Sequence, residues 1–405
     1  NFVYFAKYGK NFDGHRFLQE IIETKNFIVA EKSKTVGIIE SPYVIYVDSI
    51  EYALNKILEK LYRINSPNLK SIAVTGTNGK TSVTQFLGQM LEALTQKNIL
   101  KIGTLGIQYG SQYLAGSHVT TPEYPLFLRL LDYAEKASVG FLAIEASSHG
   151  LKEKRTGNYL FDVGIFTNFT LDHLDYHKTL EDYFNSKKRL FAECLKSKAA
   201  VIVCTVSYEW KSIIQASKGK DRKLFIVSSR YDPKEKEYFI NLLSDFLEVH
   251  IIYMENTLQS IQGLLSNIVL LTPYGKEVRR VKIETHIIGE FNIDNILCVV
   301  SACLYFSYDL EKIAEYLKIL KGVSGRLQLV NRSTDLEKPT FIVDYAHSPD
   351  ALEKVMKTCL SLLSSNKKLC VVFGCGGERD TLKRPEMGRI SAQYAHLAIV
   401  TSDNP

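Results

Sequence analysis

The chain of 405 residues is long for one domain, and its composition (45% hydrophobic, 23% charged) is that of a globular protein, which excludes disordered and collagen-like classes. The formal charge of +6 suits small anionic substrates, and no Lys/Arg stripe with interleaved aromatics points to nucleic acid. Seven cysteines without a Cys-x-x-Cys spacing indicate reduced thiols, and no apolar run or signal peptide indicates a membrane span or export, so we expect a cytoplasmic protein.

Residues 1–65 are expected to form a small N-terminal domain. Its helical and strand-like patterns predict the strands 2–6, 27–30 and 44–47 and the helices 14–24 and 49–61. Ser66-Pro67-Asn68 is the expected linker. The sequence begins at Asn1 without Met and stops at Pro405 after a strand-like run, so we expect a piece of a longer protein.

Residues 66–318 are expected to form a central α/β domain. Strands and helices alternate, which predicts a mostly parallel sheet with helices on both faces. The expected strands are 71–75, 99–104, 139–145, 161–167 and 199–204, and the expected helices are 81–95, 123–136, 179–191 and 291–305. Short antiparallel strands are expected over 238–288, with a Pro-Tyr-Gly turn at 273–275.

Residues 319–405 are expected to form a third, doubly wound domain that is cut short. The alternation continues there with the strands 340–344, 369–373 and 397–401 and the helices 349–363 and 385–394.

The most specific motif is the stretch 71–82, in which an apolar run leads through two glycines into Gly-Lys-Thr and then a helical pattern. The order strand, loop, helix is what a phosphate-cradling loop needs, because backbone N–H groups then point at the anion. Lys80 would lie on the β- and γ-phosphates, and Thr81 would be a Mg²⁺ ligand. The loop is a short variant, Gly-x-x-Gly-Lys-Thr. Its expected contacts to the nucleotide are Gly76, Thr77, Asn78, Gly79, Lys80, Thr81 and Ser82.

Polar residues follow two other predicted strands, where ligands bind in parallel sheets. Thr120 and Thr121 precede a helix, and taken alone Thr121 is better explained as a helix N-cap with Pro122 in the first turn. Glu145 ends a buried strand, where a further Mg²⁺ ligand would lie, although a plain loop glutamate is an equal alternative.

Two other local patterns remain ambiguous. His173 and His177 are four residues apart, as in helical zinc sites, but the surrounding Asn168, Thr170 and Asp172 suggest a loop, so we favour a packed or hydrogen-bonded histidine. Lys187 lies in a basic helical stretch, and on local grounds a solvated face is the better reading.

The last candidates lie towards the C-terminus. Asn292 could cap a helix or read a base edge, and Arg326 lies in a loop from which it could reach a phosphate. Asp344 ends a buried strand and could contact a ribose or phosphate, and Arg379 suits a carboxylate.

Together these motifs resemble the Mur ligase family, over nearly the whole chain. The matching segments occur in order and at family spacing: 76–81, 120–122, 145–151, 167–177, 289–295, 322–326, 344–352, 374–380 and 401–405. Gly-Cys-Gly-Gly-Glu-Arg-Asp and Asp-Asn-Pro are most similar to the branch that adds the third residue of the peptidoglycan stem peptide to UDP-MurNAc-L-Ala-D-Glu.

The resemblance implies three domains, for the UDP end, for ATP and for the incoming amino acid. It implies that ATP and two Mg²⁺ ions are used, that the D-Glu γ-carboxylate becomes an acyl phosphate, and that the protein is a cytoplasmic monomer. Catalytic roles fall on Lys80, Lys187 and Arg326, and Lys187 aligns with a carbamylated lysine of the family. The implied metal ligands are Thr81, Glu145, His173 and Lys187, which reverses the local readings of His173 and Lys187.

The resemblance also assigns the remaining contacts. The implied ATP contacts outside the loop are Asn292, Arg326 and Asp344; the implied substrate contacts are Thr120, Thr121, Ser147 and Arg155 for the UDP-dipeptide, and Arg379, Asp403 and Asn404 for the amino acid.

One departure concerns Glu153, which stands where relatives often have Gln. Arg379 and the Asp-Asn-Pro motif favour meso-diaminopimelate as the amino acid, with an Arg expected directly after Pro405. The alternatives are an L-lysine-adding ligase, another Mur or folylpolyglutamate ligase, and, in a different class, an inactive ATP-binding remnant.

Overall fold

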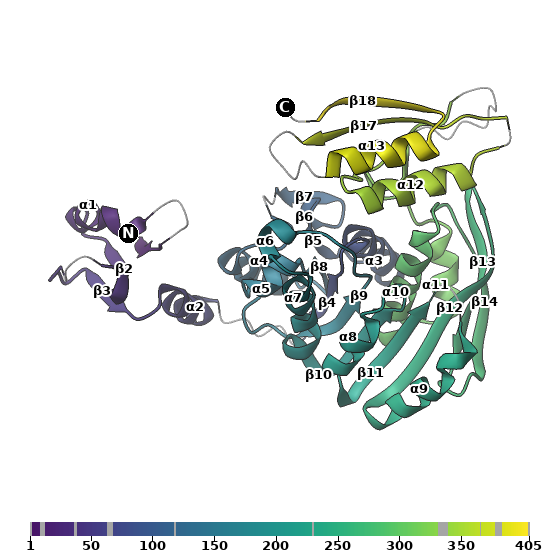
Figure 1. Ribbon diagram of the computed structural model, residues 1–405. Coiled ribbons are helices and arrows are strands. Elements are labelled where there is room, and N and C mark those ends of the chain that lie inside the picture. The colour runs from purple at the N-terminus through teal and green to yellow at the C-terminus, as the bar shows by residue number, and fades with distance from the viewer. Residues whose placement is uncertain are drawn as a thin grey trace. The chain divides into compact units, whose positions relative to one another are not determined.

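The computed structural model describes residues 2–8, 13–35, 39–62, 68–116, 119–228, 231–330, 339–364, 366–376 and 383–403 (Figure 1). The chain divides into two compact units, Asn1–Pro67 with Glu123–Ser138, and Asn68–Pro122 with Val139–Pro405. Among the described residues, no helix is both long enough and apolar enough to cross a membrane.

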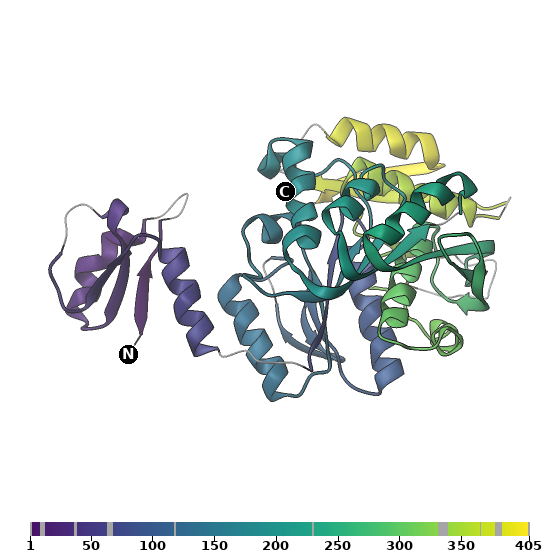
Figure 2. The same ribbon diagram turned by 90° about the horizontal axis from the view of Figure 1, so that it is seen from below.

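The first unit contains a parallel three-stranded sheet of order β1-β2-β3, formed by Val3–Ala6, Phe27–Glu31 and Val44–Val47 (Figure 2). Its helical segments are η1 (Gly14–Phe17), α1 (Leu18–Glu23), η2 (Lys32–Lys34), α2 (Ile50–Leu61) and α4 (Tyr124–Lys136). Ile28, Leu18 and Ile50 are buried together in its core. Ser49 caps α2 by accepting a hydrogen bond from the backbone N–H of Tyr52 at 3.3 Å.

The second unit is built on an eleven-stranded sheet of order β14-β13-β12-β11-β10-β9-β4-β8-β5-β6-β7. The strands from β12 to β5 in this order run parallel, and both ends of the sheet are antiparallel. The strands are β4 (Lys70–Thr75), β5 (Leu100–Gly103), β6 (Gly106–Tyr109), β7 (Gln112–Ala115), β8 (Phe141–Glu145), β9 (Phe161–Phe166), β10 (Leu195–Cys204), β11 (Gly219–Ser228), β12 (Phe246–Ser260), β13 (Gly263–Leu271) and β14 (Glu277–Thr285).

Strand β4 is where this sheet can bind a ligand. It lies between β8 and β9, and Val74 is in register with Glu145 on one side and Ile165 on the other. The three strands are parallel, so their carboxyl ends meet at one edge. Strand order reverses around β4, and such a switch point opens a crevice outside the strand ends.

Helices cover both faces of this sheet, as the alternation of the sequence predicts (Figure 1). Val163 and Ile165 belong to the core under α3 (Lys80–Thr95), α10 (Phe291–Tyr305) and α11 (Leu310–Leu317). Gly164, between them, faces Phe191 on the other side. That second layer contains α5 (Ser148–Lys152), α6 (Leu174–His177), α7 (Leu180–Glu193) and α8 (Trp210–Ala216).

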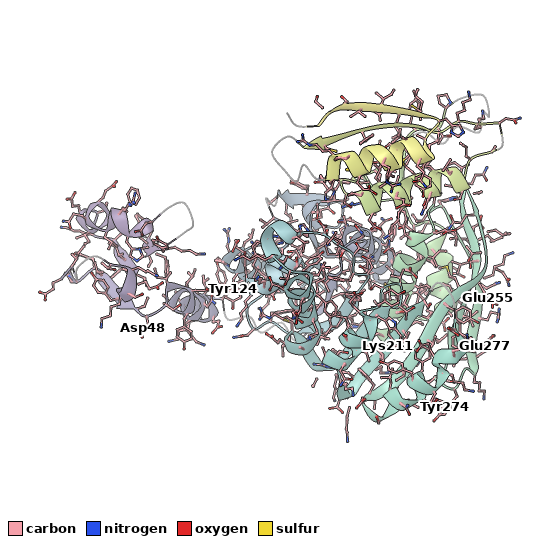
Figure 3. The ribbon with its side chains drawn as sticks, viewed as in Figure 1. Asp48, Tyr124, Lys211, Glu255, Tyr274 and Glu277 are labelled. Carbon is pink, nitrogen blue, oxygen red and sulfur yellow. The ribbon has the colours of Figure 1, made fainter. Side chains whose placement is uncertain are left out.

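The stretch 238–288 differs from the sequence expectation. It begins with the short segments α9 (Lys236–Asn241) and η4 (Leu242–Ser244), preceded by η3 (Pro233–Glu235), and its strands are long. The antiparallel pairing and the turn at Tyr274 between β13 and β14 are as expected, and Figure 3 labels Glu255 and Glu277 on β12 and β14. Arg280 of β14 forms ion pairs with both glutamates, and its pair with Glu255 links β14 to β12 across β13.

The C-terminal part of this unit has its own small core of Leu352, Met356, Met387 and Ile390. Its elements are β15 (Gln328–Leu329), β16 (Ile342–Val343), α12 (Pro349–Ser361), β17 (Cys370–Gly376), α13 (Lys383–Tyr394) and β18 (Leu397–Asp403). Strands β17 and β18 pair in parallel, as a doubly wound unit requires. The expected strand 340–344 is shorter in the structure, because only Ile342 and Val343 pair, and they pair antiparallel with β15.

Candidate functional site

The loop between β4 and α3 has the backbone that only glycine permits. Gly76 and Gly79 have φ of +148° and +87°. A Cβ on Gly76 would lie 2.0 Å from the Thr167 hydroxyl, and one on Gly79 would lie 2.5 Å from the Asn295 side-chain oxygen. Both glycines are therefore required by backbone geometry and by close neighbours, as in a loop that wraps a phosphate chain.

The segment after β9 holds this loop in place. Asn78 donates its backbone N–H to the Asn168 side chain at 2.9 Å, and its carbonyl accepts from the Thr167 hydroxyl at 2.6 Å. The Thr77 hydroxyl accepts from the backbone N–H of Thr170 at 3.0 Å. Sequence reasoning missed these supports, because they join residues about 90 positions apart and only the pairing of β4 with β9 brings them together.

Lys80, at the start of α3, folds back onto the loop. Its Nζ donates to the carbonyl oxygens of Gly76 and Thr77, both at 2.8 Å. Burial lowers the pKa of Lys80, while the carboxylate of Glu145 opposes the shift. An ammonium group held over the loop in this way is placed to contact the phosphates that such a loop binds.

Lys187 on α7 does not lie on a solvated helix face, so the local reading of the sequence was wrong. The side chain is 1% exposed, and its Nζ donates to the Gly76 carbonyl at 2.8 Å. The ring of Tyr183 lies 4.3 Å from Nζ. Burial, and then the charge of Lys80, hold the pKa of Lys187 well below its ordinary value. The helix contributes a buried amine to the site rather than a surface charge.

Glu145 closes the other side of the loop, at the end of β8. It is 1% exposed, so it is not the loop glutamate that the sequence left open. Its carboxylate accepts from the Thr81 hydroxyl at 3.0 Å, and from the Thr104 N–H and hydroxyl at 2.9 Å and 3.1 Å. Burial raises its pKa, and the charge of Lys80 opposes this. A threonine hydroxyl beside a buried carboxylate is a donor set that suits Mg²⁺.

His173 lies directly before α6 with a left-handed backbone (φ +53°), and its side chain is 41% exposed. Burial lowers its pKa, and the charges of Lys80 and Lys187 act in the same direction, so the three side chains are neighbours. His177 turns away, because its Nε2 lies 2.9 Å from the buried Ser148 hydroxyl. In the part of the chain that the structure describes, no three His, Cys, Asp or Glu side chains lie together in a way that could hold a metal ion by themselves.

Thr121 and Ser147 form a hydroxyl pair beside Glu145. The Thr121 hydroxyl donates to the Glu145 carbonyl at 2.7 Å and lies 3.0 Å from the Ser147 hydroxyl, which caps α5. The helix-cap reading of Thr121 was wrong, since α4 begins at Tyr124 with Glu123 as its cap. The Thr120 hydroxyl lies 3.3 Å from the Thr104 hydroxyl, which in turn donates to the Glu145 carboxylate.

Arg155 extends this polar group from the turn after α5. Its Nη1 donates to the Thr121 carbonyl at 2.9 Å, while Nε and Nη2 donate to one oxygen of Glu153 at 2.8 Å and 2.6 Å. The other Glu153 oxygen accepts from the Tyr176 hydroxyl at 2.7 Å. The guanidinium is thus held between a backbone carbonyl and a carboxylate two residues earlier in the chain.

Asn292 lies in the first turn of α10 and does not cap it, because the cap position is Glu290. Its amide donates to the Ile288 carbonyl at 2.7 Å, and its oxygen accepts from Asn295 at 2.9 Å. Beside it is a pocket of about 150 Å³. The pocket is lined by Phe86, His286, Ile287, Ile288, Asn292, Gly322, Arg326, Leu327, Gln328 and Leu329.

Arg326 joins this pocket to the loop, since its Nη2 lies 3.4 Å from the Thr81 hydroxyl and its guanidinium lies over the ring of Tyr345. Asp344 accepts from the backbone N–H groups of Leu327 and Ala346 at 2.7 Å and 2.8 Å. Burial raises the pKa of Asp344, against these hydrogen bonds. Its observed role is to hold the segment that carries Arg326.

The structure does not describe the side chains of the three residues that were expected to bind the amino acid. Arg379 and Asn404 lie outside the described residues, and Asp403 ends β18 but its side chain is not described. Thr104, Tyr183 and Asn295 contact the site but were missed. These contacts join residues that are far apart in the sequence, so local patterns do not reveal them. Thr104 alone carried a signal, because it lies at the end of a predicted strand.

Comparison with known proteins places this arrangement in a family. Residues 74–303 match the Mur ligase middle domain, and residues 325–405 match the Mur ligase glutamate ligase domain. UDP-N-acetylmuramoyl-L-alanyl-D-glutamate–2,6-diaminopimelate ligases (MurE) from Rickettsia felis and Geobacillus kaustophilus are 33% and 34% identical. These alignments cover 100% of this chain and 80% and 76% of the two relatives. A solved structure with the same enzyme name has a TM-score of 0.70 at 25% identity, covering 100% of this chain and 76% of that one.

Proposed function

The chain belongs to the Mur ligase family, and from that premise we propose that it adds meso-diaminopimelate to the D-Glu γ-carboxylate of UDP-MurNAc-L-Ala-D-Glu, at the expense of ATP. The observation that carries the proposal is the meeting of Lys80, Thr81 and Glu145 at one loop, directly beside the Thr121–Ser147 pair. Glu145 thus links the two proposed binding sites. Its side chain contacts Thr81 of the phosphate loop, and its backbone carbonyl contacts Thr121 of the proposed substrate site.

The nucleotide would bind along the loop and the pocket. Lys80 contacts the β- and γ-phosphates, and the backbone of Gly76 to Ser82 surrounds them. Asn292 reads the adenine edge from the adjoining pocket, which also contains Arg326. Asp344 positions the Arg326 segment and contacts the nucleotide from there.

The residues present fit magnesium as the metal. Thr81 and Glu145 offer a hydroxyl and a buried carboxylate side by side. Magnesium bound there would neutralise phosphate charge and so favour attack of the carboxylate on the γ-phosphoryl group. We assign two ions, with Glu145, His173 and a modified Lys187 around the second.

Modification of Lys187 follows from its surroundings. Burial and the charge of Lys80 hold the pKa of this amine well below its ordinary value, which favours reaction of the amine with CO₂. Addition of the neutral amine to CO₂ with loss of one proton forms a carbamate, which carries a negative charge. The new carboxylate would add a second negative charge to that of Glu145 beside Lys80.

The reaction then has two steps. The γ-carboxylate of D-Glu attacks the γ-phosphorus of ATP, ADP leaves, and an acyl phosphate forms. The amine of diaminopimelate attacks the acyl carbon, and phosphate leaves as the amide bond forms. Lys80 and Arg326 stabilise the negative charge that develops on the transferred phosphoryl group.

The other substrates take the remaining polar residues. Thr120, Thr121, Ser147 and Arg155 bind the UDP-dipeptide, beside the phosphate loop. Arg379, Asp403 and Asn404 bind diaminopimelate, whose second carboxylate matches the arginine fork.

The proposed domains follow these roles. Residues 1–65 bind the UDP end, 66–318 carry the ATP site, and 319–405 receive the amino acid; the two family matches support the last two. We place the reaction in the cytoplasm, where ATP is available. We also assign a monomer, because one chain contributes all the residues of the proposed ATP site.

The test is phosphate release measured with every combination of ATP, UDP-MurNAc-L-Ala-D-Glu and an amino acid. We expect release only when all three are present, with meso-diaminopimelate preferred over L-lysine by orders of magnitude, since lysine leaves a buried arginine unpaired. Release without the UDP-dipeptide would contradict the ligase assignment. Equal use of lysine would contradict only the choice of amino acid.

A further inference from the structure

We propose that Thr104 is a positioning residue for the metal ion, because it fixes the Glu145 carboxylate in the orientation that faces Thr81. This proposal rests on the proposed function, which makes Glu145 and Thr81 ligands of magnesium. Thr104 directly follows β5, and it would act through Glu145 rather than contact the metal ion itself.

The pairing of β5 with β8 brings Thr104 and Glu145 together. The two strands are parallel, and Ile102 is in register with Ile144. Thr104 and Glu145 therefore lie at the same edge of the sheet, where neighbouring strands end. Their contact depends on backbone pairing in the centre of the fold, which makes it a fixed feature of the site.

Thr104 holds both oxygens of the carboxylate. Its backbone N–H donates to Oε1 of Glu145 at 2.9 Å, and its hydroxyl donates to Oε2 at 3.1 Å. The Thr81 hydroxyl donates to the same Oε2 at 3.0 Å. The terminal torsion of a glutamate has only a broad preference of its own, so these donors decide where the carboxylate points.

The residue before Thr104 leaves the space that the carboxylate occupies. A Cβ on Gly103 would lie 2.0 Å from Oε1 of Glu145 and 2.6 Å from its carboxylate carbon. Any side chain at this position would push the carboxylate away from its present place. Gly103 and Thr104 therefore act together, since the first provides room and the second provides the hydrogen-bond donors.

The hydroxyl protons around Thr104 have one consistent arrangement. The Thr104 hydroxyl has a single proton and donates it to Glu145, so its oxygen accepts from the Thr120 hydroxyl 3.3 Å away. Hydrogen bonds in such a chain strengthen one another. Thr81 cannot donate to Glu145 while its oxygen binds a metal ion between them, whereas Thr104 can. Thr104 would therefore support the carboxylate in the metal-bound site.

The test measures Mn²⁺ binding to the protein saturated with ADP, with Mn²⁺ as a spectroscopic substitute for Mg²⁺. Electron paramagnetic resonance of the unbound ion gives the Kd, and ADP without protein is the reference. Thr104→Val removes the hydroxyl but keeps the shape and the backbone N–H, and it should raise the Kd by about tenfold. Thr104→Ser keeps the hydroxyl and should stay within about twofold of the wild-type Kd.

Two further variants separate positioning from a general effect on structure. Gly103→Ala leaves Thr104 unchanged but displaces the carboxylate, so it should also raise the Kd by about tenfold. Thr257→Val makes the same chemical change in a hydroxyl pair with Ser266, at 2.8 Å and outside the proposed site, and should leave the Kd unchanged. Thermal unfolding of each variant checks that it is folded.

An unchanged Kd in Thr104→Val would overturn the proposal, and so would an equal rise in Thr104→Ser, because the hydroxyl would then not be the cause. If Thr104→Val does not fold, Gly103→Ala decides, and a wild-type Kd there would show that the orientation of the carboxylate does not matter. Failure of the proposed function is a separate outcome, because the wild-type protein would then release no phosphate that depends on the UDP-dipeptide, whatever its affinity for Mn²⁺.

Discussion

Lys80 and Lys187 donate to the same acceptor, the carbonyl oxygen of Gly76, each at 2.8 Å. Two ammonium groups that share one oxygen repel each other, and this site is buried, so the charged form of each is disfavoured. Lys187 is the more buried of the two, and burial followed by the charge of Lys80 lowers its pKa strongly. The two amines at this carbonyl thus differ in environment: Glu145 opposes the lowering of the Lys80 pKa, whereas the charge of Lys80 adds to the lowering at Lys187.

The first prediction concerns that amine. Lys187→Ala should lower ligation by at least about a hundredfold, because the proposed metal site loses the carboxylate of the proposed carbamate. Added acetate or formate should restore part of the rate by filling the space that the proposed carbamate leaves. Lys188→Ala, on the next residue, is the matched control and should remain active. Full activity of Lys187→Ala without added anion would show that the lysine has only a packing role.

The second prediction concerns the phosphate loop. Lys80→Ala should lower ATP turnover by roughly a thousandfold, because the transferred phosphoryl group loses its fixed positive charge. Lys97→Ala removes an exposed lysine beyond the end of the same helix and should change little. The measurement is phosphate release under saturating substrates. Turnover near the wild-type rate in Lys80→Ala would refute the loop assignment.

The third prediction concerns magnesium. Glu145→Gln removes the charge but keeps an oxygen that can accept from the Thr104 N–H, while its NH₂ group can donate to the hydroxyls of Thr81 and Thr104. We expect the Mg²⁺ concentration for half-maximal turnover to rise by about tenfold or more, while the protein still unfolds at a similar temperature. Turnover measured against Mg²⁺ concentration checks this, and an unchanged dependence would place the metal elsewhere.

The fourth prediction concerns pH and stability. His177 has a buried side chain, and burial lowers its pKa; Asp182 opposes the shift, while Lys152 and Lys187 reinforce it. The unfolded chain therefore binds the proton first, so the free energy of unfolding should fall as pH drops below about 6.5. Denaturant unfolding from pH 7.5 to 5.5 should show a weaker decline in His177→Gln. Equal slopes would remove His177 as the cause.

The sequence predicted the parts of the site whose chemistry is local. The phosphate loop could be read directly, because Gly76 and Gly79 are required by the backbone itself. The side-chain environments of Lys187 and Thr121 could not, since burial depends on which element packs against them. A basic stretch has the same local pattern whether its lysine faces water or the Gly76 carbonyl.

The elements of the fold also divide into those that a local pattern predicted and those that it could not predict. The strand–helix alternation around β4 and α3 was correct, because each element has its own apolar period. Strand β11, Gly219–Ser228, was missed, because its first half is charged and only its second half is buried. The pairing of β16 with β15 could not be foreseen, since a two-residue strand carries no period.

The most direct test of the central claim follows one oxygen atom. UDP-MurNAc-L-Ala-D-Glu labelled with ¹⁸O in the D-Glu γ-carboxylate is ligated to meso-diaminopimelate, and the released phosphate is analysed by mass spectrometry. The acyl-phosphate route predicts one ¹⁸O atom in each phosphate formed, because the carboxylate oxygen leaves with the phosphoryl group. Phosphate without ¹⁸O in the presence of ligated product would contradict the mechanism.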